Sequence, residues 1–277
     1  MLRKPIITLI TDFGADDHFV GTMKGVILGI NPAVEIVDIC HNIASYDIFD
    51  AAYNLAQSYR FFPHDTIHLV VVDPGVGTAR RPLAARTFGY QFVAPDNGVL
   101  SLIFDREENP EVRHITADHY FLNPVSNTFQ GRDVFAPVAA WLSKGVQPAK
   151  LGDLITDYIR FAPPKPKRAG DSFMKGVVLR IDKFGNIITN ITPEDVPQLF
   201  AENPSPFKII LNEQEITRLN LSYSMGKPSE LFAIVGSAGY IEICTNRGSA
   251  AKILNVNRGA EVGVVVEGPS APAAESA

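Results

Sequence analysis

The sequence predicts two domains, an α/β domain with a mainly parallel sheet followed by a smaller all-β domain. Strand and helix signals alternate over about the first 160 residues, as they do where crossover helices join parallel strands. A stretch rich in proline and charge, Ala162–Gly170, then interrupts the alternation. Beyond it the chain shows mostly short strand signals, a pattern typical of a small barrel or a sandwich.

Apolar runs and the residues that break them place the elements of the α/β domain. A run with helical spacing ends before Asn31-Pro32, and Pro63 stops the next one. Gly89-Tyr90 separates two strand-like runs and predicts a hairpin. We expect strands at Ile6–Thr11, Val34–Ile39, Thr66–Asp73, Leu83–Phe88, Gln91–Ala94 and Val112–Thr116, and helices at Asp16–Ile30, Asp47–Phe61, Asn97–Phe104 and Asp133–Leu142.

The second domain is expected to consist of strands alone. Their predicted ranges are Lys175–Ile181, Asn186–Ile191, Phe207–Leu211, Gln214–Leu219, Leu231–Val235, Tyr240–Cys244 and Val262–Val266. The last ten residues, GPSAPAAESA, have a composition typical of disorder. The predicted organisation is therefore an α/β domain over 1–162, a linker over 163–172, a β domain over 173–267 and a disordered tail over 268–277.

The composition is that of a soluble globular protein, with 46% hydrophobic and 20% charged residues. A formal net charge of −5 and the absence of a basic run argue against a nucleic-acid partner. No apolar stretch reaches the roughly 18 residues that span a membrane, and the N-terminal apolar run lacks a signal-peptide cleavage site. Cys40 and Cys244 have no metal-like spacing and are expected to be free thiols in a reducing cytoplasm.

The segment HLVVVDPGVGTARR, residues 68–81, carries the most information about a site. Its apolar run indicates a buried parallel strand, and ligands of open α/β sheets bind beyond the carboxyl ends of such strands. Asp73 stands at that place, Gly75 and Gly77 allow a tight bend, and Arg80 is close enough in sequence to pair with Asp73. The segment alone is equally consistent with an ordinary turn and a surface arginine.

Asp12 follows the first strand in the segment Thr11–Gly14 and has three possible roles. Its carboxylate can accept two hydrogen bonds from a ribose diol. Alternatively, Asp12 or Asp16 caps the next helix. In the third interpretation Asp12, Asp16 and Asp17 bind a cation. The glycine pattern of a dinucleotide site is absent from GADDHFVG.

Three further segments combine polar residues with turn signals. In Ala94–Gly98 we expect Asp96 or Asn97 to cap a short helix. In 127–137 polar groups stand ahead of a helix and can face a ligand, although Arg132 and Asp133 are expected to pair and cap that helix. In the β domain, Asp182 and Asn186 flank Phe184-Gly185, a bend suited to a purine or an amino-acid zwitterion.

Together these segments resemble the S-adenosylmethionine hydroxide adenosyltransferases, adenosyl-forming hydrolases related to bacterial fluorinase and chlorinase. The resemblance covers roughly Ile6 to Glu267 and rests on six motifs in order: TDFG (11–14), VDPGVGTARR (72–81), APDNG (94–98), TFQGRDVFAP (128–137), DKFGNIITNI (182–191) and SAGYIEICTNRGSA (237–250). It implies an N-terminal α/β domain, a C-terminal β-barrel, and a homotrimer with active sites at subunit interfaces.

The resemblance also implies roles for individual residues. Asp12 would hold the ribose hydroxyls, while Asp73 and Arg80 would position the attacking water. The halogenases carry a tyrosine at the place of Asp73, which puts this chain with the hydrolases. The third member of the water-binding trio is a histidine in the family and is Gln130 here. The remaining implied substrate-binding residues are Phe129, Asp182, Phe184, Asn186, Ser237, Tyr240, Asn246 and Arg247.

The activity so implied is hydrolysis of S-adenosylmethionine to adenosine and methionine, by in-line attack of water at the ribose C5′, without metal or other cofactor. Three alternatives remain at this stage. The chain binds S-adenosylmethionine or adenosine without turnover, because Gln130 replaces the histidine. It uses a halide, which the Asp73 carboxylate would repel. Or it is a metal-dependent hydrolase built on Asp12, Asp16, Asp17 and Asp73, although the histidines show no ligand spacing.

Overall fold

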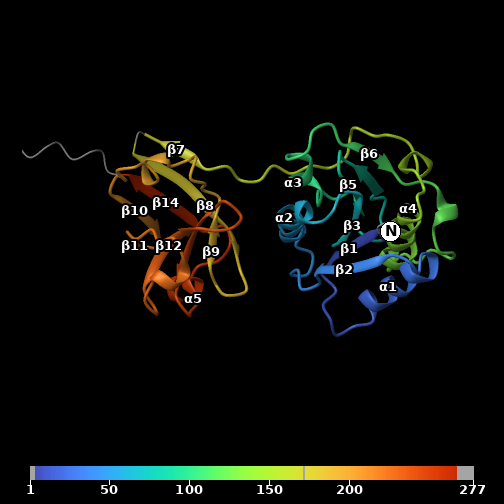
Figure 1. The fold of residues 1–277 in the computed structure, drawn as a ribbon, viewed down its shortest axis with the longest axis horizontal. Coiled ribbons are helices and arrows are strands. Elements are labelled where there is room, and N and C mark those ends of the chain that lie inside the picture. Colours follow the sequence, from blue (N-terminus) through green and yellow to red (C-terminus); the bar gives the residue numbers. More distant parts are fainter. Residues whose placement is uncertain (1–3, 171, 267–277) are drawn as a thin grey trace, which may run out of the picture. The chain divides into compact units, whose positions relative to one another are not determined.

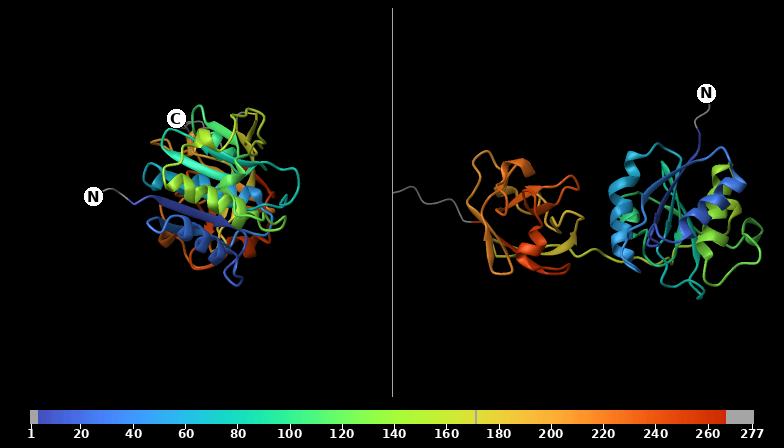
Figure 2. Two further views of the ribbon diagram at one scale, coloured as in Figure 1. Left: turned by 90° about the vertical axis from the view of Figure 1, so that its right-hand side faces the viewer. Right: turned by 90° about the horizontal axis from the view of Figure 1, so that it is seen from below.

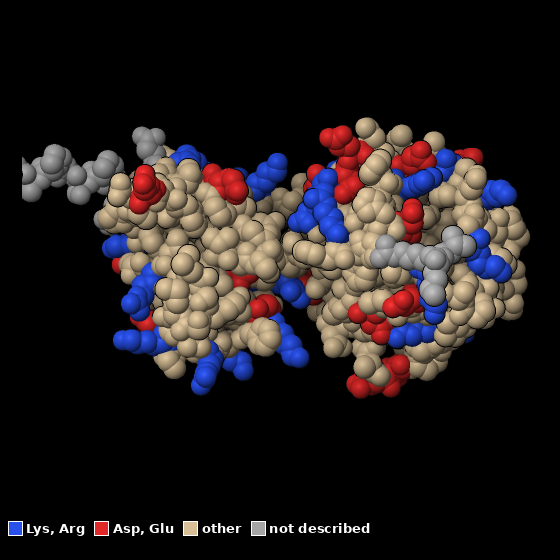
Figure 3. All heavy atoms as spheres, in the orientation of Figure 1, with Lys and Arg blue, Asp and Glu red and all other residues tan. Residues whose placement is uncertain are grey.

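The computed structural model describes residues 4–170 and 172–266, which form two compact units divided between Ala162 and Pro163 (Figure 1). The tail predicted over 268–277 lies outside the described residues. No helix of the described residues is long and apolar enough to cross a membrane. Basic and acidic side chains are interspersed on the face of both units that Figure 3 shows.

The first unit contains a six-stranded sheet in the order β2-β1-β3-β5-β4-β6. Strands β2, β1, β3 and β5 run parallel, whereas β4 pairs antiparallel with both β5 and β6. The sheet is therefore mixed, and the predicted parallel arrangement holds for three of its five strand pairings. The connection between β4 and β5 is too short for a crossover and makes a hairpin. The strand bounds are β1 Ile6–Thr11, β2 Glu35–Cys40, β3 Thr66–Val71, β4 Pro82–Arg86, β5 Tyr90–Pro95 and β6 Glu111–His114.

Helices cover both faces of this sheet, as Figure 2 shows. Leu9 and Leu69 pack with α1 (Phe19–Ile30) and α4 (Ala136–Ser143) on one face. Ile10 and Val70, their chain neighbours, pack with α2 (Ile48–Ser58) and α3 (Ser101–Phe104) on the other. Successive strand residues point to opposite faces, so burial of both faces explains the continuous apolar run Leu69–Val72 at the end of β3.

Three helix starts differ from the prediction, and one of them is that of α3, which begins at Ser101 and not at Asn97. α1 begins at Phe19, not at Asp16, and a π-helical turn over Gly131–Phe135 precedes α4. The predicted helix from Asp133 is therefore irregular at its beginning, where the polar residues of the 127–137 segment lie.

The second unit is an antiparallel, barrel-like sheet in the order β11-β10-β14-β8-β9-β13-β12. A bridge between Leu219 and Ala233 joins the chain after β11 to β12. Residues 167–169 of the predicted linker form strand β7, which pairs with β8, and a short helix, α5, was not predicted. The bounds are β7 Lys167–Ala169, β8 Phe173–Ile181, β9 Ile187–Thr189, β10 Phe207–Leu211, β11 Gln214–Ile216, β12 Leu231–Val235, β13 Ile241–Thr245, α5 Ala250–Leu254 and β14 Glu261–Val266.

His68 is a fully buried histidine in the middle of β3. Its Nδ1 lies 2.7 Å from Thr8 Oγ1, and its ring stacks on Phe92 with centroids 5.3 Å apart. Burial lowers the pKa of His68 to about 3, so the native state keeps the imidazole neutral.

This burial predicts a loss of stability in mild acid. The unfolded chain takes up a proton near the ordinary pKa of 6.5, whereas the native state does not above about 3. The contribution of His68 to the free energy of unfolding is therefore complete above pH 6.5. Below that pH it decreases by up to about 1.4 kcal/mol per pH unit. Denaturation followed by the single tryptophan, Trp141 in the first unit, should show a weaker pH dependence between 6.5 and 5 in His68→Asn. The exposed His64 supplies the control, and equal slopes for His68→Asn and wild type would contradict this account.

Candidate active site

Asp73 and Arg80 form a buried ion pair directly beyond β3. Arg80 Nε donates to Asp73 Oδ1 at 3.0 Å, and Nη2 donates to Oδ2. The two side chains are only 8% and 5% exposed. The guanidinium also lies over the Phe135 ring, 4.9 Å from its centroid. The pairing predicted from sequence proximity is confirmed, and the alternative of a surface arginine is wrong.

Gln130 joins this pair through its side-chain carbonyl. Arg80 Nη2 donates to Gln130 Oε1 at 2.5 Å. This bond orients the amide, so Nε2 is turned away from the guanidinium and has no partner among residues 4–170 and 172–266. The side chains of the trio implied by the resemblance are therefore in contact.

Gly77 allows the two loops that carry this trio to approach closely. Its φ is +76°, and a Cβ at this position would lie 2.4 Å from the backbone oxygen of Asn127. Asn127 precedes Gln130 by three positions, so the contact brings the Asp73 loop against the Gln130 loop.

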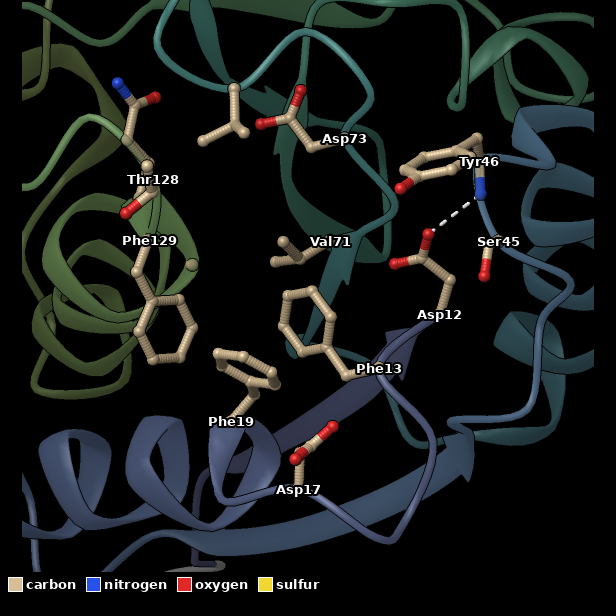
Figure 4. Close-up of a pocket in the computed structure, with 13 residues that line it drawn as sticks. Asp12, Phe13, Asp17, Phe19, Ser45, Tyr46, Val71, Asp73, Thr128 and Phe129 are labelled. Atoms are coloured by element: carbon tan, nitrogen blue, oxygen red, sulfur yellow. Dashed lines mark hydrogen bonds between the residues drawn. The ribbon is translucent and has the colours of Figure 1, made fainter.

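A pocket of about 460 Å³ opens beside Asp73 and Gln130. Asp12 lines the same pocket, and its Oδ2 accepts a hydrogen bond from the Tyr46 backbone N–H at 2.9 Å (Figure 4). The volume falls within the range of small-molecule sites. The other lining residues are Phe13, Asp17, Phe19, Ser45, Val71, Val76, Thr128, Phe129 and Gly131.

One wall of this pocket is aromatic and its rim is acidic. The rings of Phe13, Phe19 and Phe129 lie in mutual contact, with centroids 5.1–6.0 Å apart. Asp12 and Asp17 supply two carboxyl groups, and a third, Asp73, is paired with Arg80. The combination suits a ligand with an apolar part and a positive charge.

The motif around Asp96 and Asn97 supports the site and does not cap a helix. α3 begins at Ser101, and its preceding residue is Leu100. Asn97 Nδ2 instead donates to the Val72 carbonyl at 2.9 Å, immediately before Asp73. Asp96 accepts from Arg81 at 2.8 Å and from the Ile159 backbone N–H at 2.8 Å.

The capping alternative for Asp12 or Asp16 and the cap expected from Arg132 and Asp133 are also wrong. α1 follows His18, and neither Asp12 nor Asp16 caps it. Arg132 and Asp133 pair at 2.6 Å as predicted, but Asp133 accepts from the Ser126 backbone N–H and so holds a loop. Burial raises the pKa of Asp133, yet the hydrogen bonds from Arg132 and Ser126 outweigh it and hold the pKa below its usual value.

The three-aspartate cation site has no counterpart in the part of the chain that the structure describes. No group of three or more His, Cys, Asp or Glu side chains lies close enough there to hold a metal ion. Asp12 binds a backbone N–H instead.

The second unit has its own pocket, of about 510 Å³. Asp182 organises one side of it, since Oδ1 accepts from the N–H groups of Phe184 and Asn186 and Oδ2 accepts from Asn186 Nδ2, all within 2.8–2.9 Å. Phe184 is left 74% exposed at the tip of this turn. Tyr223, Thr245, Arg247 and Gly248 complete the lining.

Some predicted residues lie outside these pockets. Ser237 and Tyr240 belong to the turn between β12 and β13, where the Gly236 N–H donates to the Tyr240 carbonyl at 2.9 Å. Asn246 Nδ2 donates to the Gly226 carbonyl. Ser237, Tyr240 and Asn246 therefore do not line the pocket that Arg247 lines.

Sequence reasoning missed Tyr46 and Tyr223. Tyr46 is exposed and has a φ of +69°, and no motif marks it. Tyr223 lies in an isolated helical turn, and its hydroxyl lies 3.1 Å from Glu242 Oε2. Burial raises the pKa of Glu242, a carboxyl group 6% exposed.

Known sequences identify the relatives of this chain. A family model described as the SAM hydroxide adenosyltransferase N-terminal domain matches residues 7–152, and the corresponding C-terminal domain model matches residues 176–263. The chain belongs to this family. Within it, a protein of Salinispora tropica named (R)-S-adenosyl-L-methionine hydrolase is 34% identical over 268 residues, which cover 94% of this chain and 97% of the relative.

Two further relatives show how the family extends. A fluorinase of Nocardia brasiliensis is 28% identical over 293 residues, covering 95% of this chain and 98% of the fluorinase. The crystal structure of an uncharacterized conserved protein from Thermotoga maritima is similar with a TM-score of 0.87 and 35% identity, covering 94% of this chain and 99% of that one. The resemblance to this family inferred from the motifs is thus confirmed.

The close approach at Gly77 predicts a specific cost. Gly77→Ala introduces both a strained φ and a Cβ that overlaps the Asn127 oxygen, whereas Gly145 has a φ of +90° with open space around it. Gly145→Ala should lower the free energy of unfolding by about 1 kcal/mol from backbone strain alone. Gly77→Ala should lower the free energy of unfolding by at least about 1 kcal/mol more than Gly145→Ala does. Denaturation followed by Trp141 measures both, and equal losses would show that the two loops are not locked together.

Proposed function

We propose that this protein hydrolyses S-adenosylmethionine to adenosine and L-methionine, with water attacking the ribose C5′ in line with the departing sulfur. The observation that carries the proposal is the contact of Arg80 with both Asp73 and Gln130, at the edge of the pocket that also holds Asp12. Membership of the family and the hydrolase names of its relatives support the same conclusion.

The leaving group sets the demands on the site. Methionine departs as a neutral thioether from a sulfonium cation, so its departure needs no general acid. What the reaction needs is a positioned water and an immobilised ribose, and such orientation can supply about 7–11 kcal/mol. In this proposal Asp12 holds the ribose hydroxyls and the acidic rim attracts the cationic substrate.

Asp73 and Gln130 hold the water from two sides. Each Asp73 oxygen accepts one hydrogen bond from Arg80 and retains a lone pair for a water proton. Gln130 Nε2, turned away from Arg80, donates to the water oxygen. As the C5′–O bond forms and the C5′–S bond breaks, a water proton passes to Asp73.

Gln130 limits the proton acceptor to one residue. An amide donates and accepts hydrogen bonds but takes up no proton near neutral pH. Asp73 is therefore the base of the trio, and Gln130 orients the water without exchanging protons with it.

The remaining parts of the proposal come from the family resemblance. Phe129 and, in the second unit, Asp182, Phe184, Asn186, Ser237, Tyr240, Asn246 and Arg247 bind the substrate. The protein acts as a cytoplasmic homotrimer with active sites at subunit interfaces and needs no cofactor. Because the Salinispora tropica relative is named a hydrolase of the (R) epimer, that epimer is a candidate substrate beside the (S) epimer.

Substitutions in the trio test the proposal through adenosine release, measured for the (R) and the (S) epimer across pH. Asp73→Asn removes the base and should lower kcat by about 10²–10⁴-fold. Gln130→His should change kcat by less than about tenfold, since the amide only orients the water. Asp17→Asn removes the same charge from the same pocket outside the trio, and its kcat should stay within a few-fold, or about 1 kcal/mol, of wild type.

Each result that contradicts the proposal has a separate meaning. Undiminished turnover in Asp73→Asn would remove that residue from the reaction. A gain in kcat of about 10²-fold in Gln130→His would mean that the wild type lacks a proton shuttle. If S-adenosylmethionine is recovered intact after long incubation with the wild type, the protein binds this compound without hydrolysing it.

A further inference from the structure

We infer that His41 is a positioning residue that holds the Asp12 turn in the shape that binds ribose, although it does not line the pocket. His41 directly follows β2, the strand beside β1, whereas Asp12 directly follows β1. The inference rests on the proposed function in one respect, the assignment of Asp12 to the ribose hydroxyls.

His41 contacts the Asp12 turn at two points that flank Asp12 in the chain. Its Nδ1 lies 2.9 Å from Thr11 Oγ1, on the residue before Asp12. Its backbone carbonyl accepts from the Gly14 N–H at 2.8 Å, two residues after Asp12. Thr11 is fully buried, and its hydroxyl oxygen also accepts from the Phe13 N–H at 3.3 Å. One histidine thus fixes both ends of the turn.

The Asp38 carboxylate lies beside Nε2, the ring nitrogen of His41 that faces away from Thr11. His41 Nε2 lies 3.0 Å from Asp38 Oδ1, without the alignment of a hydrogen bond, and Lys24 Nζ binds Asp38 Oδ2 at 2.5 Å. Burial raises the pKa of Asp38, but its interactions with Lys24 and His41 hold the pKa below its usual value. The carboxylate therefore favours a proton on Nε2, which leaves Nδ1 to accept from the Thr11 hydroxyl.

The segment that begins with His41 also holds the Asp12 carboxylate itself. The Tyr46 N–H donates to Asp12 Oδ2, as Figure 4 shows, and leaves Oδ1 for a ligand. Asp12 is therefore oriented through its side chain by Tyr46 and through its backbone by His41. Loss of the Thr11 contact should let the turn move while the rest of the pocket stays intact.

Three variants separate the contacts of the ring. His41→Asn keeps an acceptor near the position of Nδ1 and so retains the bond to Thr11. His41→Gln places its amide near the position of Nε2, beside Asp38, and loses that bond. His41→Ala loses both. The backbone carbonyl that accepts from Gly14 is present in all three, so the series measures the side chain alone.

The probes are adenosine and 2′,3′-dideoxyadenosine, measured as competitive inhibitors and by equilibrium binding to the full-length protein. We expect His41→Ala and His41→Gln to weaken adenosine binding by about 5- to 30-fold, the factor expected for one or two hydrogen bonds. In these two variants the binding of dideoxyadenosine should be unchanged, and KM should rise by a larger factor than kcat falls. His41→Asn should bind adenosine nearly as tightly as the wild type does. In an Asp12→Asn background, His41→Ala should have little further effect.

Amide hydrogen exchange of residues 11–16 gives a readout that does not depend on activity. Exchange should speed up in His41→Ala and His41→Gln but not in His41→Asn. Three results would overturn the inference. They are equal losses of affinity for adenosine and dideoxyadenosine in His41→Ala, additive effects of His41→Ala and Asp12→Asn on adenosine binding, and unchanged amide exchange of residues 11–16. If the wild type releases no adenosine, the proposed function fails, while nucleoside binding and exchange still decide the role of His41.

Discussion

The ion pair of Arg80 with Asp73 is the interaction on which the rest of the site depends. One guanidinium binds both oxygens of Asp73 and the carbonyl of Gln130, and it lies against an aromatic ring in a setting from which water is largely excluded. A buried pair of this kind is costly unless its hydrogen-bonding groups are used. Here Arg80 Nε and Nη2 are used, while Nη1 is buried without a partner among the described residues. Gly77 and Asn97 fix the two loops and the strand end that bring the charges together.

The parallel part of the sheet explains why the other functional groups lie close to this pair. The adjacent strands β2, β1 and β3 end at one edge, and His41, Asp12 and Asp73 follow them within two residues. The end of β1 is tied to the segment after β2 by hydrogen bonds that do not involve a ligand. Such an edge presents carboxylates in a nearly fixed arrangement, which suits a reaction that depends on orientation more than on acid catalysis.

The pattern of apolar residues in the sequence predicts the strands that are buried in the fold. β1, β10 and β12 have the predicted bounds because each is a mostly apolar run between turns. β7 was missed because its three residues are exposed and two of them are charged. The contact of Gln130 with Arg80 spans 50 positions, so spacing could not reveal it, and the family motifs did. The sequence predicts helix caps at Asp96 and Asp133, but their partners, Ile159 and Ser126, are brought to them only by the tertiary fold.

The central claim is that water held by the trio attacks C5′ of the ribose, and the origin of the product oxygen tests it most directly. The reaction is run in water enriched in ¹⁸O, and the adenosine is analysed by mass spectrometry with fragmentation to locate the label. The account predicts one ¹⁸O atom at the 5′ position of adenosine and none in methionine. Adenosine without label at the 5′ position, or label in methionine, would contradict it.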